Sequence, residues 1–212
     1  ELCDKGLLVE SGVADSSGGR RPLLYRLNSA RYLIFCVDIS TIYCEMAVVD
    51  MSLDVRILDS FDIRENDTPD SVISRIIDGF TRFCMRLGVS SADFLAAGVS
   101  VFSSIRNEHG VLYRPIIQYM SEEWEDYPIL DRLKAGLGLP IFAEKGMNAT
   151  ARLEYNYGKG RHSRSMLYVR CGMNLRSVIM KDGDIIGDSP FAEDAFGHMV
   201  IDYDGPRCRC GQ

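Results

Sequence analysis

The clearest periodic pattern lies between residues 68 and 88, where apolar side chains recur every three or four positions. They are Val72, Ile73, Ile76, Ile77, Phe80, Phe83, Cys84 and Leu87. This spacing places them on one face of an α-helix. Thr68 can cap the start of the helix, Pro69 suits its first turn, and Gly88 is typical of a helix end. The pattern therefore predicts an amphipathic helix over 69–87.

Continuous apolar runs on both sides of this helix predict β-strands. Runs at 32–38, 43–50 and 55–63 are separated by short polar breaks, and they predict three strands in an antiparallel meander. A further run at 94–101 predicts a buried strand after the helix. Three strands, a helix and a strand, in this order, are the opening of an actin-like ATPase lobe.

The second half of the chain alternates between helical and extended patterns in a similar way. The predicted elements are a helix, an extended segment, a second helix and two strands, at 128–137, 140–143, 147–155, 165–171 and 175–180. A polar turn follows at 181–184. We place a boundary near Pro140 between a first lobe, 30–140, and a second lobe, 141–212.

The first 29 residues predict a separate small unit. Residues 1–6 look like the end of a helix closed by a glycine, and 7–10 form a short strand pattern. A tip rich in Gly, Ser and Asp follows at 11–19, and 23–28 can return as a second strand. This order is the back half of a winged helix-turn-helix, whose front helices we expect before residue 1.

Two arginines follow the glycines at the tip of the predicted hairpin. Gly19, Arg20 and Arg21 are candidate DNA-binding residues, because arginine on a flexible tip suits a narrow, electronegative minor groove. The alternative is an ordinary solvated turn. The helix end before the tip and the strand after it favour the DNA-binding interpretation.

Charge and hydropathy limit the partners of the chain. The net charge of −6 combines +1 over residues 1–31 with −7 over the remainder, so contact with DNA is expected in the first segment. No apolar stretch is long enough for a membrane span, and no signal peptide opens the sequence. We therefore expect a cytoplasmic protein that has no membrane partner.

Four segments, taken in this order, resemble the ROK family, which groups bacterial sugar-responsive repressors with sugar kinases. They are Gly18–Pro22 with Leu27–Asn28, Val37–Ser40, Ala143–Ala149 and Gly197–Gly211. The resemblance implies a two-lobed actin-like ATPase (ribonuclease H-like) α/β fold, preceded by the remnant of a winged helix-turn-helix. It also implies a DNA-binding transcriptional regulator, a repressor of carbohydrate-metabolism genes, that binds operator DNA and a sugar or sugar-phosphate effector as a homodimer or higher homo-oligomer.

The sequence departs from the kinases of this family at three points. Asp38 is followed by Ile39-Ser40-Thr41-Ile42, without the glycine pair that lets backbone approach phosphates closely. The second phosphate loop reads Gly172-Met173-Asn174-Leu175-Arg176, with one glycine. Gly146 occupies the place of the catalytic aspartate, so no side chain there can act as a general base. We therefore expect no catalytic residues and no enzyme activity.

The sugar contacts that the resemblance implies are also altered. Lys145 replaces an asparagine and Ala195 a glutamate, while His198 is retained. Lys145 and His198 are the candidate effector-binding residues, with Lys145 attracting an anionic ligand such as a sugar phosphate or a sugar acid. The alternative is a vestigial pocket in which Lys145 is a solvated surface residue.

The resemblance further implies a structural zinc site. His198, Cys208 and Cys210 have the family's ligand spacing, and a third cysteine is expected beyond residue 212. We therefore expect an incomplete ligand set within these residues and zinc in the intact protein.

Two alternative functions remain open, namely a ROK kinase that phosphorylates a hexose with ATP and a relic of the fold that docks another protein.

Overall fold

Five strands form the largest sheet of this computed structural model, which describes residues 1–15, 21–103, 105, 110–112, 122–172, 175–187 and 196–207. The first three strands form the predicted antiparallel meander and are β3 (Leu33–Ile39), β4 (Tyr43–Asp50) and β5 (Val55–Asp62). The sheet continues parallel to β3 with β6 (Phe94–Val101) and β7 (Ile141–Lys145), in the order β5-β4-β3-β6-β7. Since β7 completes this sheet, the first sheet extends past the boundary that we place near residue 140.

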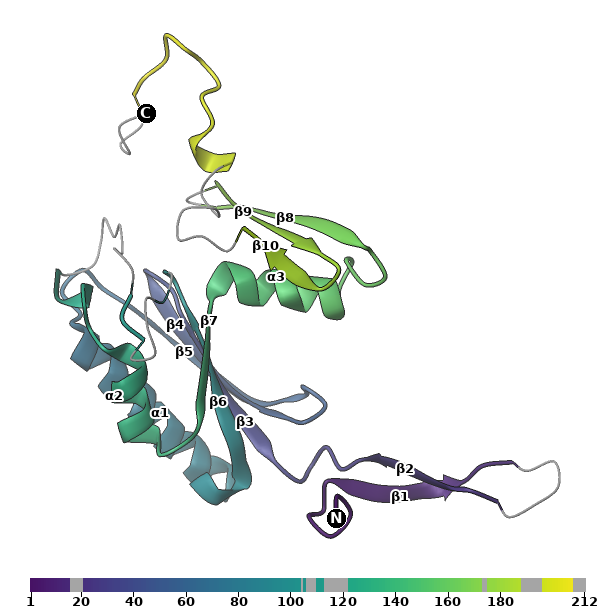
Figure 1. The fold of residues 1–212 in the computed structure, drawn as a ribbon. Coiled ribbons are helices and arrows are strands. Elements are labelled where there is room, and N and C mark those ends of the chain that lie inside the picture. Colours follow the sequence, from purple (N-terminus) through teal and green to yellow (C-terminus); the bar gives the residue numbers. More distant parts are fainter. Residues whose placement is uncertain are drawn as a thin grey trace.

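Two helices cover one face of this sheet (Figure 1), and they are α1 (Pro69–Leu87) and α2 (Ile129–Leu137). The Thr68 hydroxyl accepts a hydrogen bond from the backbone N–H of Ser71, and Gly88 ends α1 in the left-handed conformation with φ 67°. The apolar stripe of α1 packs onto the sheet, where the Phe80 ring lies 5.0 Å from that of Phe35. The predicted helix over 69–87 is confirmed.

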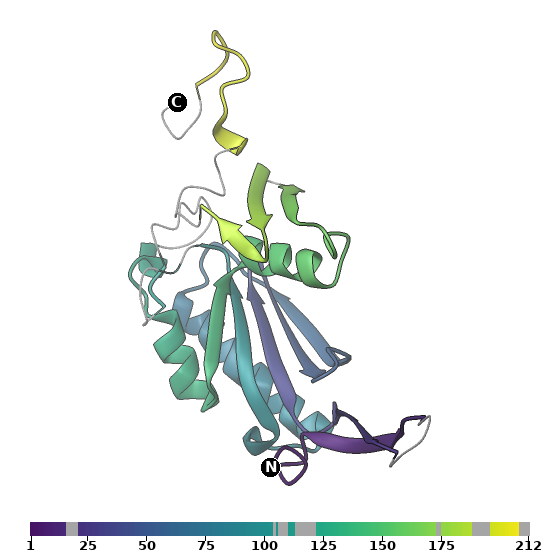
Figure 2. The same cartoon turned by 45° about the vertical axis from the view of Figure 1, so that its right-hand side comes forward.

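A second, smaller layer is built from one helix and three strands (Figure 2). These are α3 (Gly146–Asn156), β8 (Ser165–Cys171), β9 (Leu175–Lys181) and β10 (Asp184–Ile186), with the strands antiparallel in the order β10-β9-β8. Met147 and Ala151 of α3 pack against Val178 and Met180 of β9. The strands predicted at 165–171 and 175–180 and the turn between β9 and β10 are confirmed. They could be predicted because alternating apolar residues and a turn at Asp182-Gly183 are local signals.

A two-stranded hairpin projects from the end of the first sheet that lies away from α3 (Figure 1). Its strands are β1 (Leu8–Val13) and β2 (Leu23–Leu27). The predicted tip begins too early, because pairing continues through Val13. A bulge between Glu10 and Gly12 makes this extension feasible, and Gly12 adopts φ 135°, which side chains rarely allow.

The turn that precedes the hairpin has the hydrogen bonds of a helix end. The N–H of Gly6 donates to the Cys3 carbonyl at 2.9 Å, and the N–H of Leu7 donates to the Leu2 carbonyl at 3.0 Å. Gly6 has φ 69°. This pair of bonds around a left-handed glycine is the Schellman motif expected from Gly6, although residues 2–6 form a turn rather than a helix. None of the helices among the described residues combines the length and apolar character that a membrane crossing requires.

A buried carboxylate closes the turn between β4 and β5. Asp50 is 1% exposed, accepts hydrogen bonds from the backbone N–H groups of Ser52 and Asp54, and pairs with Arg56 at 2.6 Å. Burial acts to raise the pKa of Asp50, but the backbone donors of Asp54 and Ser52 and the Arg56 guanidinium together lower the pKa below its usual value. The ionised form of Asp50 therefore stabilises this turn.

Candidate ligand-binding cleft

The carboxyl ends of three neighbouring parallel strands meet at the edge of the first sheet that faces α3. Asp38 of β3 lies in register with Ser100 of β6, and Ser100 lies in register with Glu144 of β7. Helix α3 begins at Gly146, directly after β7. Open α/β sheets bind ligands outside the carboxyl ends of their strands, so this edge is the candidate site.

Asp38 is held by hydroxyl donors from two different strands. The Ser100 hydroxyl donates to Asp38 Oδ1 at 2.6 Å, and the Tyr43 hydroxyl donates to Asp38 Oδ2 at 3.4 Å. Burial and the neighbouring Asp38 charge raise the pKa of Tyr43, so its hydroxyl keeps its proton and remains a donor. The arrangement orients the Asp38 carboxylate at the carboxyl ends of the parallel strands.

The space beside Gly146 is partly occupied by the Ser100–Asp38 pair. A Cβ atom at position 146 would lie 3.0 Å from Ser100 Oγ and 3.9 Å from Asp38 Oδ1. The first distance is shorter than ordinary contact, so a side chain here requires Ser100 to shift. Besides lacking a general base, position 146 is therefore packed as a glycine.

The turn between β3 and β4 is tight, and its Ser40 N–H and Ile42 carbonyl are engaged. The Ser40 N–H donates to the Tyr43 carbonyl at 2.9 Å, and the Ile42 carbonyl accepts from the Ile63 N–H at 2.9 Å. An anion-binding loop requires several backbone N–H groups that point toward the ligand. Because the Ser40 amide is used within the turn, it is not available to a phosphate in this conformation.

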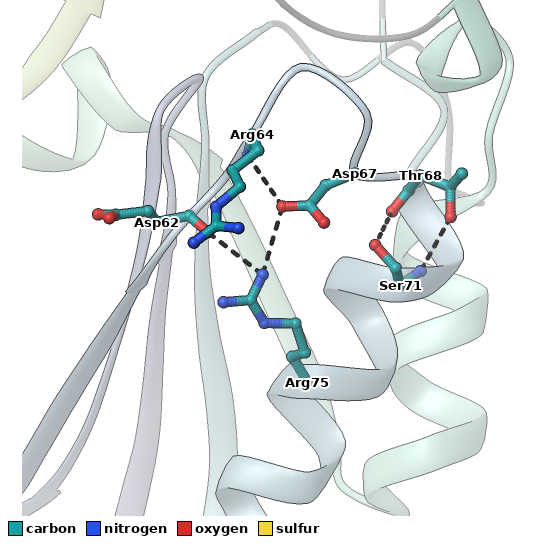
Figure 3. Close-up of polar contacts among 6 residues, drawn as sticks. All are labelled: Asp62, Arg64, Asp67, Thr68, Ser71 and Arg75. Carbon is teal, nitrogen blue, oxygen red and sulfur yellow. Dashed lines mark hydrogen bonds and ion pairs between the residues drawn. The ribbon is translucent and has the colours of Figure 1, made fainter.

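The segment beside this turn is braced by Asp67 and Arg75 (Figure 3). Asp67 accepts hydrogen bonds from the Arg64 N–H at 2.8 Å and from the Arg75 guanidinium at 3.3 Å. Arg75 also donates to the Asp62 carbonyl at 3.2 Å. Its guanidinium lies 3.8 Å from the centroid of the Phe61 ring. These contacts join the end of β5 to α1 beside the turn at 40–42.

Lys145 is buried, which corrects the interpretation of this residue as a solvated surface lysine. Its side chain is 5% exposed, and the neighbouring Asn148 is 3% exposed. Glu144 Oε1 accepts from the Lys145 N–H at 3.0 Å and from the Asn148 amide at 3.2 Å, while Glu144 Oε2 lies 3.5 Å from Arg152. Lys145 is therefore not a solvated surface residue, and its role toward an effector stays a prediction.

The second layer contacts the end of β6 through Arg176, while His198 lies in a short helix that packs on β9. Arg176 of β9 donates to the Phe102 carbonyl, just beyond β6, at 3.3 Å. His198 is half-buried in the short helix η4 (Phe196–His198). A Cβ at Gly197 would lie 2.5 Å from the Leu175 carbonyl oxygen, so only glycine allows η4 to pack this closely on the start of β9.

Several predicted site residues lie outside the described residues, namely Gly19, Arg20, Cys208 and Cys210. Arg21 is described, and it is exposed beside β2. Among the described ranges, no group of three or more His, Cys, Asp or Glu side chains could hold a metal. The zinc site and the DNA-binding tip therefore stay predictions.

Ser100, Tyr43 and Asn148 were not predicted as site residues from the sequence. Ser100 had a usable signal, because it is a polar residue near the end of the apolar run at 94–101. Tyr43 and Asn148 had no comparable signal, since their roles depend on contacts across strands or with Glu144.

Comparison with known proteins shows the family of this chain. The model of the ROK family matches residues 34–212. The chain belongs to the ROK family. It is similar to the xylose repressor of Bacillus spizizenii, with 26% identity over 212 residues, which are 99% of this chain and 53% of the repressor. It is also similar to the Escherichia coli DNA-binding transcriptional repressor Mlc, with 23% identity over 100% of this chain and 51% of Mlc.

Glucokinases match a smaller share of this ROK chain. The glucokinase of Streptomyces coelicolor is 27% identical over 177 residues, which are 82% of this chain and 52% of the enzyme. The chain thus spans about half the length of the curated relatives it matches.

Solved structures show the same ROK fold. A ROK family transcriptional regulator, a homologue of the E. coli Mlc protein, superposes with a TM-score of 0.78 at 19% identity, over 100% of this chain and 52% of the regulator. The ROK hexokinase of Thermus thermophilus gives 0.65 at 21% identity, over 84% of this chain and 57% of the enzyme. The overall α/β fold expected from the resemblance is confirmed by these superpositions.

Proposed function

We propose that the intact protein is a cytoplasmic DNA-binding transcriptional regulator, a repressor of carbohydrate-metabolism genes, whose ROK domain binds a ligand without transferring phosphate. This proposal rests on how much of the chain each relative matches. The two repressors match 99% and 100% of the chain, the glucokinase matches 82%, and the family model begins at residue 34. The segment before residue 34 supports a kinship with the repressors rather than with the kinases.

The geometry of this segment supports DNA binding as a winged helix-turn-helix. A helix end closed by Gly6 leads into a projecting hairpin, and Arg21 lies exposed where the tip returns to β2. Together with Gly19 and Arg20, Arg21 would enter the minor groove. A recognition helix ahead of residue 1 would read the major groove, and two copies in a homodimer would read two half-sites.

The cleft supports ligand binding without phosphotransfer. Gly146 offers no general base, Ser100 fills the adjacent space, and the turn at 40–42 lacks the glycines that phosphate binding needs. The buried Lys145 and the half-buried His198 are the residues that we assign to a sugar or sugar-phosphate effector. A structural zinc on His198, Cys208 and Cys210, completed by a later cysteine, would fix the histidine.

The test uses intact protein and DNA duplexes selected from a random library at constant salt. We expect the selected duplex to bind about a thousandfold more tightly than unrelated duplex, as is ordinary for specific recognition. In a coupled assay of the same preparation, ATP with D-glucose or D-xylose should give no sugar-dependent turnover. Equal affinity for selected and unrelated duplexes contradicts the proposal.

A sugar kinase is the second candidate, because the glucokinase relative has the highest identity quoted above, at 27%. Sugar-dependent turnover of about 1 per second or more would establish it. If the intact protein neither binds DNA specifically nor phosphorylates sugars, a protein-docking role of the fold becomes the better explanation.

A further inference from the structure

The segment between the hairpin and the first sheet makes an unusual set of contacts with the helix end before the hairpin. We call residues 28–32 the linker and residues 1–27 the hairpin unit. The backbone N–H of Asn28 donates to the Leu7 carbonyl at 2.9 Å, and the Asn28 side-chain amide donates to the Gly6 carbonyl at 2.9 Å. The Arg31 Nε donates to the Lys5 carbonyl at 3.3 Å.

Three consecutive carbonyls are therefore taken by two linker residues. The Lys5 carbonyl belongs to the turn that Gly6 closes, while the Gly6 and Leu7 carbonyls lead into β1. All three receive their partners from 21 or more positions later in the chain. The helix end, the hairpin and the linker consequently form one hydrogen-bonded unit.

Arg31 also faces the first lobe. Its guanidinium lies 4.2 Å from the centroid of the Tyr32 ring, and its aliphatic stem packs on Gly6, where a Cβ would approach it to 3.3 Å. Its charge also contributes to the lowered pKa of Asp93, behind the larger effect of hydrogen bonds from Ser90. Arg31 thus touches the helix end and the linker, and interacts electrostatically with the lobe.

The linker continues directly into the strand that carries the cleft carboxylate. Strand β3 begins at Leu33 and reaches Asp38 after about 17 Å, at about 3.3 Å per residue. Beside the linker, the Ser29 carbonyl accepts from the Met51 N–H at 3.1 Å, and a pocket of about 460 Å³ opens between Leu33 and Leu87. This pocket is lined by Arg31 of the linker and by Leu87 and Asp93 of the lobe.

We propose that Asn28 and Arg31 are positioning residues, which lock the hairpin unit onto the start of β3 and so set the orientation in which it meets DNA. This proposal rests on the function proposed above. Neither residue needs to contact DNA. Their effect on affinity comes from pre-organisation, since a hairpin that is free to reorient must be ordered again on binding.

The experiment uses the intact protein with the duplex selected above. Arg31→Ala should accelerate amide hydrogen exchange at Asn28 by about fivefold or more, the ratio that corresponds to one ordinary hydrogen bond, while exchange within β3 stays unchanged. Affinity for the duplex should fall by about fivefold as well, and Arg31→Lys should recover part of both effects. Arg86→Ala, which removes an exposed arginine from α1, is the control and should change neither.

Two results overturn the proposal. One is an exchange rate at Asn28 that is the same in Arg31→Ala as in the wild type, because Arg31 then does not stabilise the helix end. The other is faster exchange with unchanged DNA affinity, because the contacts then do not position the hairpin unit. If the wild type binds no duplex specifically, the proposed function fails, and the exchange rates still decide whether the contacts lock the unit.

Discussion

A carboxylate at position 146 would distinguish a ligand cleft from a phosphotransfer site. Gly146→Asp adds the acid that the resemblance places there in kinases, at the start of α3. Its Cβ would lie 3.0 Å from Ser100 Oγ and 3.9 Å from Asp38 Oδ1. Gly146→Asn is the matched control, because it has the same size and no charge.

The magnitude follows from the distance to Asp38. The new carboxylate would lie about 5 Å from Asp38, where two like charges repel by about 3 kcal/mol at an effective dielectric constant of about 20. Asp38 is half-buried, so solvent screening reduces this repulsion to about 1–2 kcal/mol. The N-terminus of α3 offsets about 0.3–1 kcal/mol of it. We therefore expect Gly146→Asp to be about 1 kcal/mol less stable than Gly146→Asn at neutral pH.

The assay is urea unfolding of both variants of the intact protein as a function of pH. The repulsion raises the pKa of the new carboxyl in the folded state, so the deficit is complete above that raised pKa and disappears below the unfolded value of about 4. Gly146→Asp should still show no sugar phosphorylation, because the turn at 40–42 lacks glycines. Equal stability of the two variants at neutral pH would refute the electrostatic reasoning. Sugar turnover by Gly146→Asp would refute the claim that the turn at 40–42 cannot bind the phosphates of ATP.

Three further predictions concern the wing, the metal and acid stability. Replacing Arg20 and Arg21 with Ala should weaken duplex binding and flatten its salt dependence by up to about two units of slope; an unchanged slope indicates a solvated turn. Metal analysis of the intact protein should find about one zinc per chain, lost on replacing Cys208 or Cys210 with Ala, and zinc retained without both cysteines contradicts the site. Asp50→Asn should destabilise the protein at neutral pH, and urea unfolding should show the gap closing as pH falls below about 4, because the lowered pKa of Asp50 confines its stabilisation to higher pH. A gap that is independent of pH contradicts this role.

Elements whose signals lie in neighbouring residues could be predicted from the sequence. Helix α1 follows from Thr68, Gly88 and an apolar stripe, and strand β6 follows from a continuous apolar run. The helix end at Gly6 is another example, since a single left-handed glycine accounts for both of its closing hydrogen bonds. In each case the local preference and the fold favour the same conformation.

Features that depend on packing between distant segments could not be predicted in this way. Lysine is usually a surface residue, but Lys145 is buried. The reason is that α3 folds back over the ends of β6 and β7 and packs on β9. The contact of Arg176 with the Phe102 carbonyl joins residues far apart in the chain. The extension of β1 to Val13 depends on a bulge, which shifts the register without any change in the apolar pattern.

The role of the hairpin unit in DNA binding is tested most directly by recovering genomic DNA with the intact protein. Fragmented DNA from the source genome would be bound, recovered and sequenced for the wild type and for the variant with Arg20 and Arg21 replaced by Ala. We predict enrichment of a few sites next to carbohydrate-metabolism genes with the wild type, and loss of this enrichment with the variant. The same unselective recovery of DNA by both proteins would contradict a sequence-specific repressor.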